Sequence, residues 1–275
     1  MNIEKHYRRL IKFMPDAPIY AVKPDSKYIV ISDIHMGKQD GADDFYQNLP
    51  MTAVLFIKLV NEGFKFIPDG DIWELLECDA ADVFDHYKSL LELIYSNLAT
   101  CQTPRGSKHG IGYCNHDAEL PKILGKGAIG EWFKKLVPNP CFWRVSKLST
   151  NAYITHGDLG DFFNDDAHWA FTKWIVRNVW ARWQRWHGRP DITSPAKNKD
   201  RASDMELGYR YAISQLGNIG IYGHTHEAKQ EGFYINIGTS NTVGYITYGL
   251  IYDCKFHLMR TNDMGTTCLK VITLI

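Results

Sequence analysis

The stretch that decides the fold is Lys27-Tyr28-Ile29-Val30-Ile31-Ser32-Asp33-Ile34-His35, an apolar run that closes on an acidic residue and a histidine. A short run of this kind, rich in β-branched residues, predicts a buried strand that ends at Ser32 and Asp33. Residues two apart share a face of an extended chain, so Asp33 and His35 can point the same way. We therefore expect a pair of ligand side chains at the end of this strand.

Four further cassettes follow short apolar runs in the same manner: Gly70-Asp71-Ile72-Trp73-Glu74, Asn115-His116-Asp117, His156-Gly157-Asp158 and Gly223-His224-Thr225-His226. Carboxylate, imidazole and amide oxygen are ligands for divalent metal ions. The alternative, that all of them are satisfied polar residues of the core, is disfavoured because buried His and Asp are costly without partners. The sequence therefore predicts a metal site built from several strand ends.

Between the cassettes, predicted strands alternate with predicted helices. Apolar runs predict strands at 64–67 and 110–113, and apolar spacing predicts helices at 51–61 and 80–98. Such alternation is typical of βαβ units in an α/β fold, whose ligand sites gather beyond the carboxyl ends of the strands. Every cassette occupies that position.

The remainder of the chain predicts one domain spanning 1–275. Further strands are expected at 141–147, 152–155, 219–222, 233–237 and 243–253, with 268–275 pairing at an edge. Residues 3–14 predict a short amphipathic helix that packs on the edge of the domain. No internal repeat or low-complexity segment divides the sequence.

An insertion of different character lies at about 160–215. Between 169 and 187 it carries five tryptophans, and four of them share one broad apolar arc of a predicted helix. This helix breaks at Gly188-Arg189-Pro190, and a second helix is expected at about 202–215. From Lys173 to Arg201 there are eight Lys and Arg against two Asp, so the insertion is basic within a neutral protein.

The composition excludes several classes of protein. Lys and Arg equal Asp and Glu at 31 each, so no overall charge points to nucleic acid or to an anionic membrane. Hydrophobic residues make up 45% of the chain, which allows a sizeable core. The six cysteines read as reduced thiols, and Cys114 is expected to be a small apolar residue at a strand end. With no run of 18 apolar residues and no signal-like N-terminus, we expect a cytoplasmic protein.

The cassettes suit hydrolysis at phosphorus. Two divalent ions about 3.5–4 Å apart can hold a hydroxide between them and clamp both ends of an in-line attack. Such a site needs a bridging carboxylate. Asp71 is the best candidate, because Gly70 before it lets the backbone approach closely.

In their order and spacing, the five cassettes resemble the motifs of the calcineurin-like metallophosphoesterase superfamily, over essentially the whole chain. The resemblance implies a four-layer α/β/β/α sandwich with a helical lid insertion. It also implies two divalent ions, Mn²⁺ first, with Fe or Zn²⁺ as alternatives. One ion would be held by Asp33, His35, Asp71 and His226, and the other by Asp71, Asn115, His156 and His224.

The same resemblance gives His116 the task of meeting the phosphoryl group and protonating, or electrostatically assisting, the leaving oxygen. Glu74, three residues after the bridge, would orient His116 through a hydrogen bond. Asp117 and Asp158 are expected to shape the loops or support the ligands. The histidines outside the cassettes are expected to have no function: His6, His86, His109, His168, His187 and His257.

Within the superfamily, the chain is most similar to the UDP-2,3-diacylglucosamine hydrolases of lipid A synthesis. The similarity lies in His156-Gly157-Asp158 and in the helical insertion just before the last cassette. Those enzymes use the insertion as a lid over acyl chains, and Ser194, Asn198 and Arg201 resemble the substrate-contacting residues of that lid in spacing. This implies a nucleotide-lipid or phospholipid-like substrate and peripheral contact with the inner face of the membrane.

Three positions depart from this pattern. Cys114 stands where glycine is usual, and Arg201 stands where lysine is expected. His116 stands where the hydrolases of that pathway carry arginine, whereas imidazole is usual there in general phosphodiesterases. The resemblance therefore implies hydrolysis of a phosphoester or pyrophosphate bond but does not identify the substrate.

Several alternatives remain. Basic residues beside tryptophans also suit single-stranded nucleic acid, which would make the chain a nuclease, and a cyclic-nucleotide phosphodiesterase fits the same chemistry. The Trp-rich face equally suits packing on the sheet or a dimer seam, so the oligomeric state stays open. A non-catalytic scaffold of this fold is the last alternative, but such scaffolds lack the assisting histidine and some ligands that this chain keeps.

Overall fold

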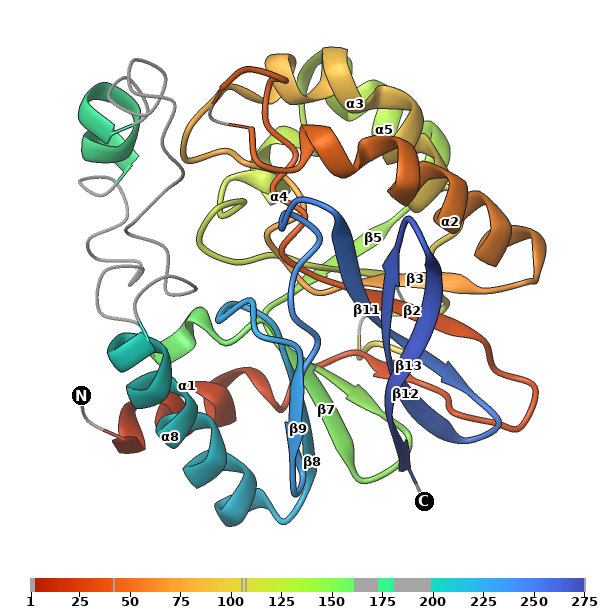
Figure 1. The fold of residues 1–275 in the computed structure, drawn as a ribbon, viewed down its shortest axis with the longest axis vertical. Coiled ribbons are helices and arrows are strands. Elements are labelled where there is room, and N and C mark those ends of the chain that lie inside the picture. Colours follow the sequence, from red (N-terminus) through yellow and green to blue (C-terminus); the bar gives the residue numbers. More distant parts are fainter. Residues whose placement is uncertain are drawn as a thin grey trace.

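The computed structural model describes residues 3–41, 43–104, 106, 108–160, 173–180 and 199–274. Within these residues the chain forms two large mixed sheets with helices on both outer sides (Figure 1). This is a mixed α/β architecture, as the alternation of strands and helices predicts.

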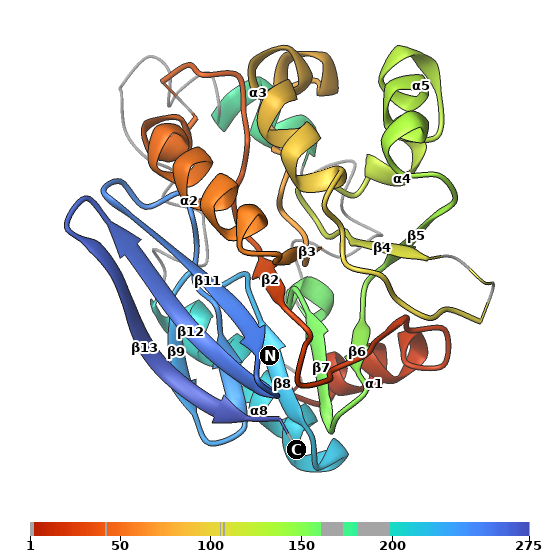
Figure 2. The same cartoon turned by 90° about the vertical axis from the view of Figure 1, so that its right-hand side faces the viewer.

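The first sheet is built around the strand that opens the sequence analysis. That strand, β2 (Tyr28–Ile31), pairs in parallel with β3 (Lys65–Pro68) and antiparallel with β11 (Tyr245–Tyr252). Beyond β11, the strands β12 (Lys255–Asn262) and β13 (Gly265–Thr273) carry the sheet to its outer edge (Figure 2). On the other side, a bridge from the residue after β3 leads to β4 (His109–Gly112), which pairs in parallel with β5 (Pro140–Trp143).

The second sheet has six strands in the order β1-β6-β7-β8-β10-β9. Its central strands β7, β8 and β10 are parallel, so their carboxyl ends lie at one edge of the sheet. The bounds are β1 (Ile19–Tyr20), β6 (Ser146–Leu148), β7 (Ala152–Thr155), β8 (Ile219–Tyr222), β9 (Lys229–Glu231) and β10 (Tyr234–Asn236).

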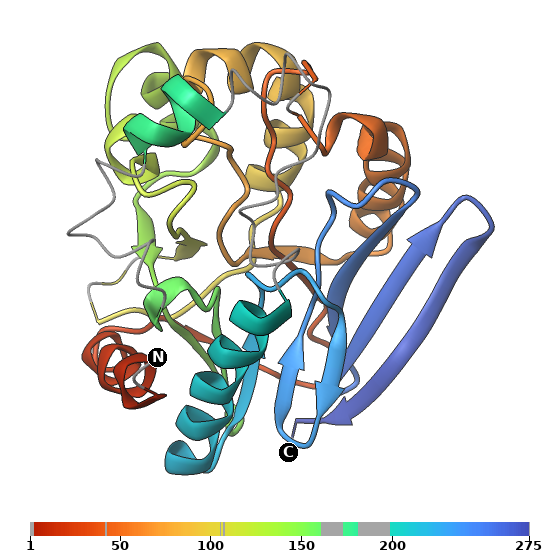
Figure 3. The same ribbon diagram turned by 60° about the vertical axis from the view of Figure 1, so that its left-hand side comes forward.

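Helices cover the outer faces of the two sheets (Figures 1 and 3). The first sheet carries α2 (Leu49–Asn61), α3 (Ala80–Tyr95) and α5 (Gly127–Leu136), and the second carries α1 (Ile3–Phe13) and α8 (Lys199–Leu216). Short turns complete the described chain: η1 (Tyr46–Asn48), α4 (Leu120–Ile123), η2 (Asp158–Gly160) and η3 (Val176–Trp180).

The buried side chains divide into three apolar clusters that follow these layers. Val30 of β2 shares the cluster between the sheets with Ile154 and Ile221 of the second sheet. Its neighbours Ile29 and Ile31 belong to the cluster under α2 and α3. A third cluster joins the second sheet to α1 and α8. All four residues of β2 are therefore buried, because both faces of its sheet are covered.

The sequence prediction is wrong for one strand and omits several elements of the described fold. The strand expected at 141–147 is two strands, β5 and β6, which lie in different sheets and are separated by Arg144 and Val145. The sequence pattern predicts neither the strands β1, β9 and β12 nor the helices α4 and α5. Elsewhere the predicted elements form, within a few residues of their expected ends.

The insertion expected at 160–215 lies partly outside the described residues. Of its Trp-rich helix, 173–180 is described and is helical, and its second predicted helix corresponds to α8. Among the described residues, no helix combines the length and the apolar character needed to cross a membrane.

Candidate metal centre

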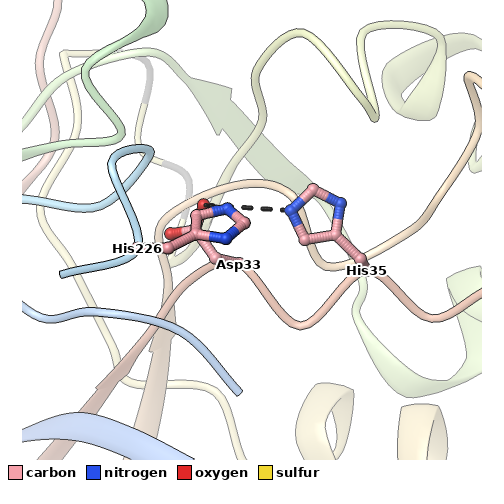
Figure 4. A group of neighbouring side chains, drawn as sticks. All are labelled: Asp33, His35 and His226. Carbon is pink, nitrogen blue, oxygen red and sulfur yellow. Dashed lines mark ion pairs between the residues drawn. The ribbon is translucent and has the colours of Figure 1, made fainter. Parts of the chain in front are cut away.

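The carboxylate of Asp33 lies between two histidines that come from opposite parts of the sequence. Its Oδ1 lies 2.9 Å from Nε2 of His226 and 3.9 Å from Nε2 of His35, and both rings point toward it (Figure 4). Gly223 allows this approach, because a Cβ there would lie only 2.4 Å from Oδ2 of Asp33. The end of β2 and the loop after β8 therefore meet at this carboxylate.

Asp71 follows β3, and its two carboxylate oxygens have different partners. Its Oδ1 accepts hydrogen bonds from the backbone N–H of His116 at 3.0 Å and from Sγ of Cys114 at 2.5 Å. Its Oδ2 lies 3.0 Å from Nε2 of His156 and 3.7 Å from Nε2 of His35. One oxygen of Asp71 thus faces two imidazoles that the sequence analysis gives to different ions.

The remaining predicted ligands follow β4, β7 and β8. His156 follows β7 and His224 follows β8, and Nε2 of His156 lies 3.1 Å from Nδ1 of His224. Both rings are buried, and so is Asn115, which follows β4. All seven predicted metal ligands therefore come from the strand-end loops that the sequence indicates.

Glu74 receives hydrogen bonds from two histidines. Its carboxylate lies 2.7 Å from Nδ1 of His35 and 2.7 Å from Nδ1 of His116. As an acceptor it places a proton on Nδ1 of each ring and leaves Nε2 of each ring for another partner. The Nε2 atom of His35 is buried, has no hydrogen-bond partner and faces Asp33 and Asp71. A metal ion is the partner that such an atom fits.

The buried carboxylates and imidazoles of this cluster shift one another's pKa values. Burial alone would raise the pKa of Asp33, but the imidazoles of His156 and His226 outweigh it and hold the pKa well below its ordinary value. Burial opposes the imidazolium of His156, yet the carboxylates of Asp71 and Asp33 raise its pKa to about 10. Protons on His156 and His35 therefore balance the buried carboxylates, whereas burial lowers the pKa of His226. A divalent ion would replace those protons, since metal ligation requires neutral imidazole.

The backbone at the centre is strained. Five of the seven predicted ligands have φ between 49° and 69°, a left-handed conformation that costs about 1–3 kcal/mol per residue outside glycine. They are Asp33, His35, Asp71, His224 and His226. Such strain clusters at functional sites, where the surrounding structure imposes it.

The two acidic residues expected to support the loops do so through different partners. Asp117 accepts the backbone N–H groups of Cys114 and Ile72, and burial raises its pKa to about 7. Asp158 forms a buried ion pair with Arg144 at 2.5 Å.

Sequence reasoning missed Ser32, Arg144 and the role of Cys114. Ser32 lies 2.6 Å from Oδ2 of Asp33 and 3.0 Å from Nδ1 of His156, and its position directly before Asp33 was the only signal. Arg144 was placed inside a strand, where nothing in the sequence pairs it with Asp158. Cys114 is buried as expected, but its thiol contacts Asp71 instead of acting only as an apolar group.

The predicted lid residues are only partly described. Ser194 and Asn198 lie outside the described residues, and Arg201 lies in the first turns of α8. The described part of the insertion is tied to the segment after Asp117 by an ion pair between Lys173 and Glu119. Its Trp174 and Val179 are 60% and 54% exposed.

Comparison with known proteins gives no family. No family model matches the chain, and no curated protein matches it. Two solved structures of cold-active protein tyrosine phosphatases, one from a psychrophilic Shewanella species, align with TM-scores of 0.43 and 0.45. They are 13% and 14% identical to the chain, and each alignment covers 92% of it and 80% or 82% of the phosphatase. Similarity at this level identifies neither family nor activity.

Proposed function

We propose that the chain is a dinuclear-metal hydrolase of phosphoester or pyrophosphate bonds, with the four-layer fold of the calcineurin-like metallophosphoesterases. The observation that carries the proposal is the placement of Asp71. One of its oxygens faces His156 at 3.0 Å and His35 at 3.7 Å, and the facing nitrogen of His35 has no hydrogen-bond partner. A carboxylate between two groups of imidazoles is the arrangement that a bridging ligand needs.

Asp33, His35, His226 and Asp71 would hold one ion, and Asp71, Asn115, His156 and His224 would hold the other. The donors are mixed nitrogen and oxygen, which suits Mn²⁺, Fe or Zn²⁺, with Mn²⁺ our first expectation. Bound ions would supply an activated water nucleophile and neutralise the charge that develops on the phosphoryl group.

His116 is the proposed general acid. Its side chain is 22% exposed, so it reaches the surface of the centre, where a substrate would approach. Burial opposes its imidazolium, but the charges of Glu74 and Asp71 outweigh burial and raise the pKa of His116. The ring therefore carries a proton that it can give to the leaving oxygen, while Glu74 fixes its orientation.

The proposed substrate is a nucleotide-lipid or phospholipid-like molecule. Support comes from the basic character of the insertion and from the exposed apolar side chains of Trp174, Ile175 and Val179. Acyl chains suit such a surface, and Lys and Arg beside it suit phosphate. Peripheral contact with the inner face of a membrane through the insertion belongs to the same proposal.

Hydrolysis assays with Mn²⁺ test this function directly. The protein is expected to cleave a detergent-solubilised lipid pyrophosphate, and Asp71→Asn is expected to abolish the cleavage, whereas the exposed Asp25→Asn is expected to retain it. Preferential cleavage of single-stranded DNA or of a cyclic nucleotide would replace the lipid substrate with the nuclease or phosphodiesterase alternative. No hydrolysis of any of these esters would favour the non-catalytic scaffold.

A further inference from the structure

The thiol of Cys114 lies inside the candidate metal centre. Cys114 follows β4, is fully buried, and places Sγ 2.5 Å from Oδ1 of Asp71. Gly70 makes room for it, because a Cβ at that position would lie 2.6 Å from Sγ and 3.3 Å from Cβ of His156. The backbone is therefore shaped to bring the sulfur next to the carboxylate.

The sulfur is one of several converging donors. Sγ of Cys114, an oxygen of Asp71 and a ring nitrogen of His156 all lie within 4.8 Å of one another. Next to this group, Nδ1 of His224 lies 3.1 Å from Nε2 of His156 and supplies a second ring nitrogen nearby. One sulfur, one oxygen and two nitrogens form a donor set that proteins use for zinc and iron.

A separate observation marks Asp71 as a shared ligand. Nε2 of His35 is buried, has no hydrogen-bond partner and lies 3.7 Å from Oδ2 of Asp71, the same oxygen that lies 3.0 Å from Nε2 of His156. Cys114 therefore touches a carboxylate that is already placed for ions, and it is not an isolated buried cysteine.

We propose that Cys114 is a further, thiolate ligand of the second ion, added to Asp71, Asn115, His156 and His224, and that it makes this half of the centre prefer Zn²⁺ or Fe²⁺ to Mn²⁺. This inference rests on the proposed dinuclear centre. When the ion binds, the S–H bond breaks, the sulfur keeps the electron pair for the metal, and the proton leaves to solvent. Soft thiolate favours zinc and iron, whereas manganese favours carboxylate and water oxygen.

Cobalt substitution of the full chain tests the assignment. After removal of metal by chelation, Co²⁺ titration is expected to produce a sulfur-to-cobalt charge-transfer band in the near ultraviolet. Cys114→Ser is expected to lose this band, while Cys101→Ser, which removes a buried thiol outside the centre, is expected to keep it. The ratio of Zn²⁺ to Mn²⁺ affinity is also expected to fall about ten-fold or more in Cys114→Ser.

The outcomes separate this inference from the proposed function. Two bound cobalt ions per chain without the band would overturn the role of Cys114 and leave the dinuclear centre intact. No bound cobalt would overturn both. If Cys114→Ser fails to fold, the cadmium-113 NMR spectrum of the wild-type chain decides, since a sulfur ligand moves the resonance to much higher frequency than nitrogen and oxygen ligands do.

Discussion

Glu74 connects two histidines to which the proposal gives different tasks. It accepts hydrogen bonds from His35, a proposed ligand, and from His116, the proposed acid. The two imidazoles oppose burial and hold the pKa of Glu74 at about 2, so the carboxylate stays charged. A single residue would therefore orient a ligand of the proposed metal site and the proposed proton donor together.

Glu74→Gln is expected to lower metal affinity and turnover at once. The neutral amide loses the charge that both rings face, and loss of a carboxylate that orients a metal-bound histidine typically costs 10–100-fold in affinity or activity. Metal titration and steady-state kinetics measure the two effects. Glu92→Gln, which changes a carboxylate bonded to Trp132 on the outer helices, is the control and should change neither. Loss of turnover with unchanged metal affinity would contradict the proposal that Glu74 orients His35 as a metal ligand.

His116→Ala is expected to lower turnover without lowering metal content, in contrast to Glu74→Gln, which lowers both. The proposed acid is not a proposed ligand, so metal content should stay near that of the wild type. Turnover should fall by about 10²–10⁴-fold, the usual contribution of a positioned acid. Elemental analysis and kcat provide the two readouts. Equal loss of metal and of turnover would contradict the assigned role.

At this scale, the sequence identified the acidic residues and histidines that come together and missed their neighbours, for one physical reason. Asp33 and Asp71 are recognisable because costly polar residues end apolar runs. Ser32, Cys114 and Arg144 are ordinary at a strand end, and only the meeting of distant loops gives them partners. Such contacts are tertiary and leave no local pattern.

At the scale of elements, α1 shows that the sequence can predict a helix and still not predict which of its side chains are buried. The apolar spacing predicts a helix on the domain edge, and α1 forms there and packs on α8. Its His6, expected to have no function, is buried, with its ring edge-on to Tyr209 at 4.8 Å. Burial, aided by His224, lowers the pKa of His6 to about 3.

His6 is therefore expected to make the fold sensitive to acid. The unfolded chain protonates this histidine near pH 6.5, whereas the folded chain keeps it neutral down to about pH 3, so stability falls as the pH drops through this range. The loss at pH 3 is on the order of 4 kcal/mol. In His6→Phe this contribution disappears, so the free energy of unfolding from urea denaturation should fall less on acidification.

The control for this prediction is His86→Phe, which changes an exposed histidine and should follow the wild-type curve. All three proteins are measured with chelator present, so that metal release does not contribute. Parallel curves for His6→Phe and the wild type would contradict the burial argument.

The failure to predict strand β12 from the sequence has a local cause. The hairpin between β11 and β12 turns at Asp253 and Cys254, both with positive φ of 50° and 56°. Two consecutive left-handed residues are typical of a tight hairpin turn, but the usual sequence signal is a glycine, which is absent here. The sequence pattern therefore predicts one strand that ends at residue 253 and no second strand over 255–262.

At the scale of the whole molecule, the layers explain why the centre lies where it does. Two sheets pack through one apolar cluster, and helices cover their outer faces (Figures 1 and 3). This brings the end of β2 next to the end of β7, where Ser32 lies 3.0 Å from His156. The sequence predicted the strands and the α/β class, but the packing of one sheet on the other depends on side-chain contacts between remote segments.

The central claim is that side chains from both sheets hold two ions at one point, and the most direct test is the metal content of the purified chain. The chain is saturated with Mn²⁺ and free ion is removed. Elemental mass spectrometry is then expected to find two ions per wild-type chain. Asp71→Asn, which removes the proposed bridge, is expected to hold one or none. A wild-type chain that hydrolyses phosphoesters while it binds no ion would contradict the account.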